Sequence, residues 1–124
     1  MGDDNTGKEG ADLLVVLNHA PHGSAWVREG LEVALVAATL GQRVSVLLTG
    51  EGVWAAVKQQ HSGALSQKGT HTTLEALSMY DIEPLLLDVG ALSSRGLTLD
   101  AMLDGCKACD ARTTLAGHSN ILVF

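Results

Sequence analysis

One uninterrupted apolar run constrains the fold of this chain more than any other feature. Residues Leu13–Leu17 read Leu-Leu-Val-Val-Leu, which is the length of a strand and contains no polar residue. A strand with one face in water alternates apolar and polar side chains, so a continuous run predicts a strand buried on both faces, as in a parallel sheet. Residues 25–40 then have helical spacing, and residues 44–48 form a second predicted strand.

The rest of the chain continues the alternation of strands and helices. Further strands are predicted at 84–87 and 120–124, and further helices at 53–57, 70–79, 91–95 and 106–116. Residues 121–124 are all apolar, so we expect the last strand to be buried. Residues 58–69 are polar without periodicity and predict an exposed loop, whereas residues 98–104 fit either a strand or a helix. The predicted fold class is α/β: a three-layer, flavodoxin-like sandwich with a mostly parallel sheet of four or five strands.

Length, charge and cysteine content limit the class of protein. The chain of 124 residues matches one domain, placed at 11–124 after a polar, acidic and flexible N-terminal segment, residues 1–10. No apolar run is long enough to span a bilayer, no secretory signal opens the chain, and two cysteines are too few for a disulfide framework. We therefore expect a cytoplasmic protein without membrane contact. The net charge of −6 and the aromatic content of 3% oppose direct binding of nucleic acid.

The predicted helix at 25–40 carries two apolar stripes. One consists of Val27, Leu31, Ala34 (or Leu35) and Ala38, and the other of Trp26, Val33, Val36, Ala37 and Leu40. A single sheet face buries only one of them, so the second predicts a subunit interface. Gly30 inside this helix costs about 1 kcal/mol relative to alanine, which predicts a close approach of the helix to a neighbouring backbone.

Ligands of open α/β sheets bind beyond the carboxyl ends of the strands, which selects the loops at 19–24, 49–52 and 88–90. The first loop holds five candidate binding or interface residues: His19, Pro21, His22, Gly23 and Ser24. It is interpreted either as a pocket for a small anion or acyl group or as a capped turn whose histidines face solvent or a neighbouring chain. The scattered histidines give no metal site, and the glycines at 50 and 52 lack the rest of a nucleotide-binding loop, so no cofactor is expected.

The pair Cys106 and Cys109 is the second candidate for chemistry. At the start of the predicted helix at 106–116, the helix dipole and Lys107 would favour thiolate and make a redox or sulfur-carrying pair. The alternative is two small side chains on a peripheral helix. Both readings remain open at the level of the sequence.

Five collinear motifs resemble the TusC/DsrF branch of the DsrE/DsrF-like family. They are APHGS at 20–24 with REGLE at 28–32, GEGVW at 50–54, MYDIE at 79–83, LSSRGL at 92–97 and ILVF at 121–124. The resemblance implies a subunit of a hetero-oligomeric sulfur relay, with sister subunits of the DsrE/TusD and DsrH/TusB types or a homo-oligomer when isolated. It adds Arg28, Glu29, Tyr80 and Asp81 to the expected interface residues.

The resemblance also implies which subunit of the complex carries the sulfur. In the sister subunit the acceptor cysteine lies after the third strand, eight residues before the glycine of an arginine-glycine pair, and the same count from Gly96 reaches Asp88. The implied role is a non-catalytic docking subunit in tRNA 2-thiouridine synthesis or intracellular sulfur oxidation. Two alternatives stay open: a sulfurtransferase that carries persulfide on Cys106 or Cys109, and a small-molecule binding module that uses the loop at 19–24.

Overall fold

The sheet is built around the first apolar run. The computed structural model describes residues 11–21, 25–58 and 73–124. Five strands form one sheet in the order β4-β3-β2-β1-β5, and every neighbouring pair is parallel. Their bounds are Leu13–Leu17 for β1, Val44–Leu48 for β2, Leu85–Asp88 for β3, Cys106–Cys109 for β4 and Ile121–Val123 for β5. The predicted α/β sandwich with a parallel sheet is confirmed.

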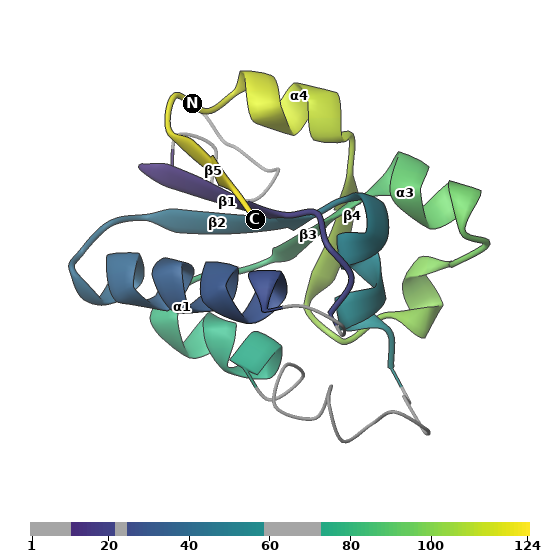
Figure 1. The fold of residues 1–124 in the computed structure, drawn as a ribbon, viewed down its shortest axis with the longest axis horizontal. Coiled ribbons are helices and arrows are strands. Elements are labelled where there is room, and N and C mark those ends of the chain that lie inside the picture. Colours follow the sequence, from purple (N-terminus) through teal and green to yellow (C-terminus); the bar gives the residue numbers. More distant parts are fainter. Residues whose placement is uncertain (1–10, 22–24, 59–72) are drawn as a thin grey trace.

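Helices cover both faces of this sheet (Figure 1). Helix α1 (Trp26–Thr39) lies on one face, with the 3₁₀ helix η2 (Leu77–Tyr80) packed beside it, and α4 (Ala111–Ala116) lies on the other. The 3₁₀ helix η1 (Gly50–Ala56) and helix α3 (Val89–Ser94) follow directly after β2 and β3. A last 3₁₀ helix, η3 (Leu99–Ala101), precedes β4. None of the helices in the described part of the chain is long and apolar enough to cross a membrane.

The alternation along β1 divides the core into two clusters. Leu13, Val15 and Leu17 belong to the large cluster under α1, while Leu14 and Val16 belong to a smaller cluster on the opposite face. All five residues of β1 are buried, because both faces of this strand are covered. The continuous apolar run is therefore explained by its place inside a parallel sheet.

The prediction of a helix over 106–116 is wrong in its first half. Cys106–Cys109 is β4, which pairs with β3 in the register Leu85↔Cys106 to Asp88↔Cys109. Asp110 then begins α4, because its carboxylate accepts hydrogen bonds from the Thr113 amide at 3.1 Å and the Thr113 hydroxyl at 2.7 Å. Residues 106–116 could form either one weak helix or a short edge strand followed by a capped helix. The strand forms because the edge of β3 is free to pair with it, and the sequence does not show this.

Smaller differences concern the ends of elements. Residues 98–104 contain η3 and then Met102, which forms an isolated antiparallel bridge with Val57. The helix predicted at 53–57 is the 3₁₀ helix η1, which begins three residues earlier at Gly50. The last strand joins the sheet beside β1, but the expectation that it is buried is wrong, since Leu122 is 44% and Val123 62% exposed at the sheet edge. The predicted loop at 58–69 lies, apart from Lys58, outside the described residues.

Gly30 marks a close approach, although not to a backbone as expected. A Cβ atom at this position would meet the side chain of Leu17 and the ring of Phe124. Leu17 is fully buried, so α1 sits on the sheet at a distance that only a glycine permits. The helix thereby also comes into contact with the last residue of the chain.

Candidate functional site

Asp88 ends β3 and serves as the N-cap of α3. Its carboxylate accepts a hydrogen bond from the Gly90 amide at 3.2 Å and another from the Thr49 hydroxyl at 3.1 Å. Thr49 stands at the end of β2, so the side chain of Asp88 ties together the segments that follow two neighbouring strands. Both carboxylate oxygens are thus used in holding the backbone at the carboxyl edge of the sheet.

Arg95 makes a second link across the same edge. Its guanidinium donates to the Glu51 carboxylate from Nη2 at 2.8 Å and from Nε at 3.1 Å, and its Nη1 donates to the Ala91 carbonyl at 3.1 Å. The forked geometry fixes the end of α3 against η1. Thr49, Glu51 and Arg95 were not among the predicted site residues. Glu51 and Arg95 belong to the motifs at 50–54 and 92–97 that resemble the family. Their place in these motifs is the sequence feature that could have identified them as site residues.

The two cysteines lie on opposite faces of the sheet. Residues three apart on a strand point to opposite sides: Cys106 packs against the large cluster under α1, and Cys109 belongs to the small cluster on the face of α4. Both are free thiols. The prediction of a cysteine pair at the start of a helix is therefore wrong. The two thiols lie on opposite faces of an edge strand, so they cannot form a disulfide with each other.

The surroundings of both thiols oppose ionisation. Burial, with a smaller contribution from the Asp104 carboxylate, raises the pKa of Cys106 to about 11. Burial also raises the pKa of Cys109; a hydrogen bond with Thr114 opposes this shift, while Asp88 and Asp110 add to it. Lys107 lowers the pKa of Cys109 only as the smallest of these influences. The expected stabilisation of a thiolate by a helix dipole and Lys107 is thus not what the structure provides.

The first loop is described only at its ends. His19 is exposed and stacks on Trp26, with 5.2 Å between the ring centroids and 20° between the planes, and Pro21 is buried. His22, Gly23 and Ser24 lie outside the described residues. Helix α1 has Ala25 at its N-cap without a side-chain cap.

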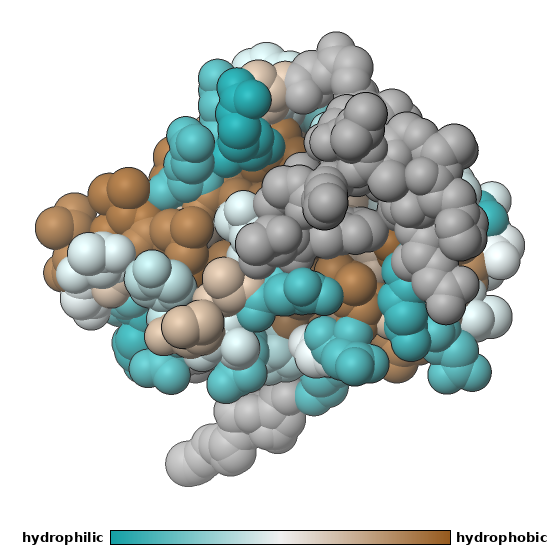
Figure 2. Space-filling view, turned by 90° about the horizontal axis from the view of Figure 1, so that it is seen from below, coloured by the Kyte–Doolittle hydropathy of each residue, from teal (hydrophilic) through white to brown (hydrophobic). Residues whose placement is uncertain are grey.

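An open apolar groove runs along α1. It is lined by Glu29, Glu32, Val33, Val36, Leu40 and Phe124, among others. The exposed fractions are 58% for Val36 and 78% for Leu40, so these two members of the second stripe are not covered by the described residues. Val33 and Ala37 of the same stripe are half-buried. Figure 2 shows hydrophobic side chains gathered at the end of the molecule where α1 terminates in Figure 1. Phe124 was missed as a groove residue, because its place beside α1 depends on the sheet order.

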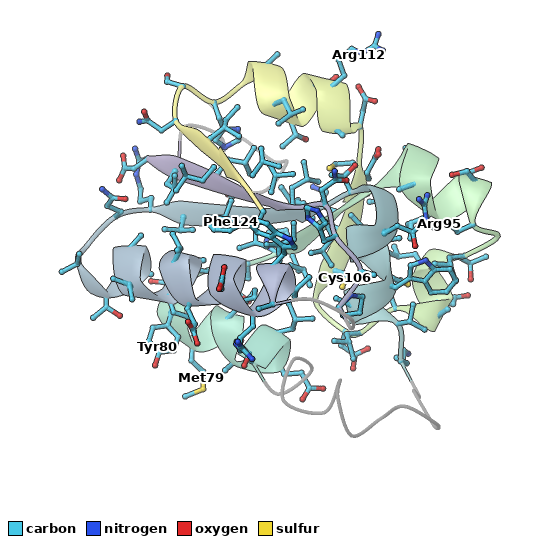
Figure 3. All side chains as sticks on the ribbon, viewed as in Figure 1. Met79, Tyr80, Arg95, Cys106, Arg112 and Phe124 are labelled. Atoms are coloured by element: carbon cyan, nitrogen blue, oxygen red, sulfur yellow. The ribbon has the colours of Figure 1, made fainter. Side chains whose placement is uncertain are left out.

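The remaining predicted residues are spread over one side of the molecule. Arg28 and Glu29 are exposed on α1. Tyr80 is 47% exposed at the end of η2, and Asp81 follows it with a left-handed φ of 63°. Figure 3 shows Tyr80 pointing away from the sheet below α1, far from Arg95 and the carboxyl edge. These four residues therefore lie on the side of α1 and η2, separate from Asp88.

The chain is similar to known proteins in sequence and in fold. The model of the DsrE/DsrF-like family matches residues 11–119. Protein TusC of Klebsiella pneumoniae is 37% identical over 85 residues, which are 68% of this chain and 71% of that protein. The intracellular sulfur oxidation protein DsrF of Allochromatium vinosum is 32% identical over 85 residues, 68% of this chain and 62% of that protein. The crystal structure of the ychN protein from E. coli has a TM-score of 0.70 at 20% identity and covers 92% of this chain and 99% of its own. This last likeness concerns the fold alone.

Proposed function

Because the chain belongs to the DsrE/DsrF-like family, we propose that it is a non-catalytic docking subunit of a hetero-oligomeric sulfur relay complex. Its partners are sister subunits of the DsrE/TusD and DsrH/TusB types, and the complex works in the cytoplasm in tRNA 2-thiouridine synthesis or in intracellular sulfur oxidation. The relatives named TusC and DsrF, at 37% and 32% identity, support this assignment. It binds no nucleic acid itself, since its net charge is −6.

The observation that carries the proposal is the state of Asp88. In a sulfur relay an acceptor thiolate attacks the terminal sulfur of a donor persulfide, the donor leaves as a thiolate, and the acceptor becomes the new persulfide. A carboxylate at the acceptor position cannot take part in this exchange. Asp88 instead accepts hydrogen bonds from the Gly90 amide and the Thr49 hydroxyl, so the position has a structural use in this chain.

The surroundings of the cysteines support the same division of labour. An acceptor has to be an accessible thiol with a thiolate population at neutral pH. Cys109 is buried, and the pKa of Cys106 is raised to about 11. The proposal therefore assigns sulfur transfer to a cysteine of a sister subunit and assembly to this chain.

The test replaces both cysteines with serine and measures sulfur transfer by the complex reconstituted with its sister chains. Activity close to that of the wild-type complex is expected for C106S/C109S. The matched control is serine in place of the acceptor cysteine of the sister chain, which should abolish transfer. A hundredfold loss in C106S/C109S with the assembly intact would overturn the proposal and make this chain a sulfurtransferase in its own right.

A further inference from the structure

We propose that the groove between α1 and Phe124 receives an apolar helix of another chain whose flanks carry lysine or arginine. This inference rests on the proposed docking function and names the chemistry of the partner at one surface. The occupant of the groove is a different chain and not a second copy of this one.

The spacing of the lining residues fits a helix as the ligand. Glu29, Val33, Val36 and Leu40 line the groove and recur every three or four positions, so they form one face of α1 over three turns, about 16 Å in length. A row of this kind accepts the ridge of a second helix laid alongside it. Phe124, which belongs to the same groove and packs against the core under α1, forms the opposite wall.

The charge along the rim selects the partner. Glu29 and Glu32 line the groove, both are exposed, and neither carboxylate forms an ion pair among the residues that the structure describes. The two ion pairs found among the described residues engage other acids, Asp12 and Glu51. An apolar floor with unpaired carboxylates on its rim is complementary to an apolar stripe flanked by cations.

The same charges disfavour a second copy of this chain. A two-fold symmetric contact places the same patch of both subunits together. It would therefore enclose the carboxylates of Glu29 and Glu32 from both copies in one interface, with no lysine or arginine among the groove residues to balance them. The net charge of −6 adds repulsion over a longer range. With a basic partner neither repulsion arises, and the attraction between opposite charges raises the association rate.

Two synthetic amphipathic helices provide the probe. Both carry the same leucine stripe; one has lysine and the other glutamate at its remaining positions. The wild-type chain should bind the lysine peptide at least tenfold more tightly, with amide shifts of Val33, Val36 and Leu40 in NMR spectra. In E29K/E32K this preference should fall by tenfold or more. The control E75K/D100K changes the net charge equally, at exposed acids outside the groove, and should keep most of it.

The outcomes separate this inference from the proposed function. An equal effect of both double variants, or shifts confined to another face, would overturn the groove as a basic-helix site. Concentration-dependent dimerisation of the wild-type chain in sedimentation, abolished by V36E, would show a second copy as the occupant and would also overturn it. A complex that forms with E29K/E32K as readily as with wild type, while C106S/C109S remains active, would leave the docking function intact and refute only the groove.

Discussion

Asp88 shows how one residue decides between a chemical and a structural role. In our proposed function, the end of β3 is the position at which a sister subunit carries its acceptor thiol. The carboxylate instead caps α3 through the Gly90 amide and holds the Thr49 hydroxyl. These hydrogen bonds fix the start of α3 against the end of β2, so the residue that we propose in place of an acceptor thiol also stabilises the edge of the sheet.

Removing this carboxylate should weaken the fold. We expect D88A to lower the free energy of unfolding by about 1 kcal/mol, within the usual range of about 0.5–2 for an N-cap, because the Gly90 amide and the Thr49 hydroxyl lose their acceptor. Urea denaturation measures the change. D88N should remain close to wild type, since asparagine caps equally well. A D88A protein as stable as wild type would show that the contacts contribute nothing.

The thiol of Cys106 should be unreactive in the folded protein. Its pKa is raised from 9.0 to about 11, which leaves roughly a hundredfold less thiolate at neutral pH, and the thiolate is the species that reacts. In C109S, alkylation by iodoacetamide at pH 8, followed by mass spectrometry, should be about two orders of magnitude slower than in the same chain unfolded in urea. Equal rates in the two states would refute the burial argument.

At the scale of elements, the sequence correctly predicted the helices and strands whose hydrophobic pattern is strong within their own residues. The run at Leu13–Leu17 and the stripes of α1 are periodic, and the structure confirms them. The short elements depend on neighbours distant in sequence. Residues Cys106–Cys109 become a strand because the edge of β3 is open to them, and the exposure of β5 follows from its place at the edge. The groove could be predicted only with the strand order in hand, because Phe124 comes to lie against α1 through the pairing of β5 with β1.

The contact between α1 and the sheet should not tolerate a methyl group at Gly30. Alanine gains about 1 kcal/mol in helix propensity, but its Cβ would meet the side chain of Leu17 and the ring of Phe124, and overpacking of a core costs about 1–3 kcal/mol. We expect G30A to be less stable than wild type by thermal unfolding. The control is G117A, where a Cβ meets no atom closer than 3.6 Å. A stabilised G30A protein would contradict this account of the contact.

The cap of α4 should contribute to stability only while Asp110 is ionised. Hydrogen bonds from the Thr113 hydroxyl and then from the Thr113 amide lower the pKa of Asp110 below 3.8. A carboxyl whose folded pKa is lowered stabilises the fold above its unfolded value, and this contribution is lost as the pH falls through the folded pKa. The Tm of D110A, followed from about pH 5 to pH 2, should therefore fall less on acidification than that of wild type. Parallel curves would show that the cap is not titrating.

At the scale of the whole molecule, the carboxyl edge of the sheet and the side of α1 differ in how their side chains are engaged. The carboxyl edge is closed by its own links, Thr49 to Asp88 and Glu51 to Arg95. The side of α1 is left with exposed Val36 and Leu40 above the Phe124 groove. Exposed apolar patches of this kind mark interaction surfaces. Polar side chains therefore link the segments at the carboxyl edge, whereas the surface that we propose for binding lies on α1.

A charge on that helix face should separate assembly from folding. Val36 is 58% exposed, and glutamate is a good helix former, so V36E should leave the Tm of the isolated chain nearly unchanged. In the complex, the same change removes an apolar contact and adds a carboxylate beside Glu29 and Glu32, which should reduce the affinity for the sister chains by about tenfold or more. Size-exclusion chromatography of the reconstituted complex measures the loss. S93E, an equal charge at an exposed position of α3, should assemble like wild type, and a V36E chain that assembled equally well would place the interface elsewhere.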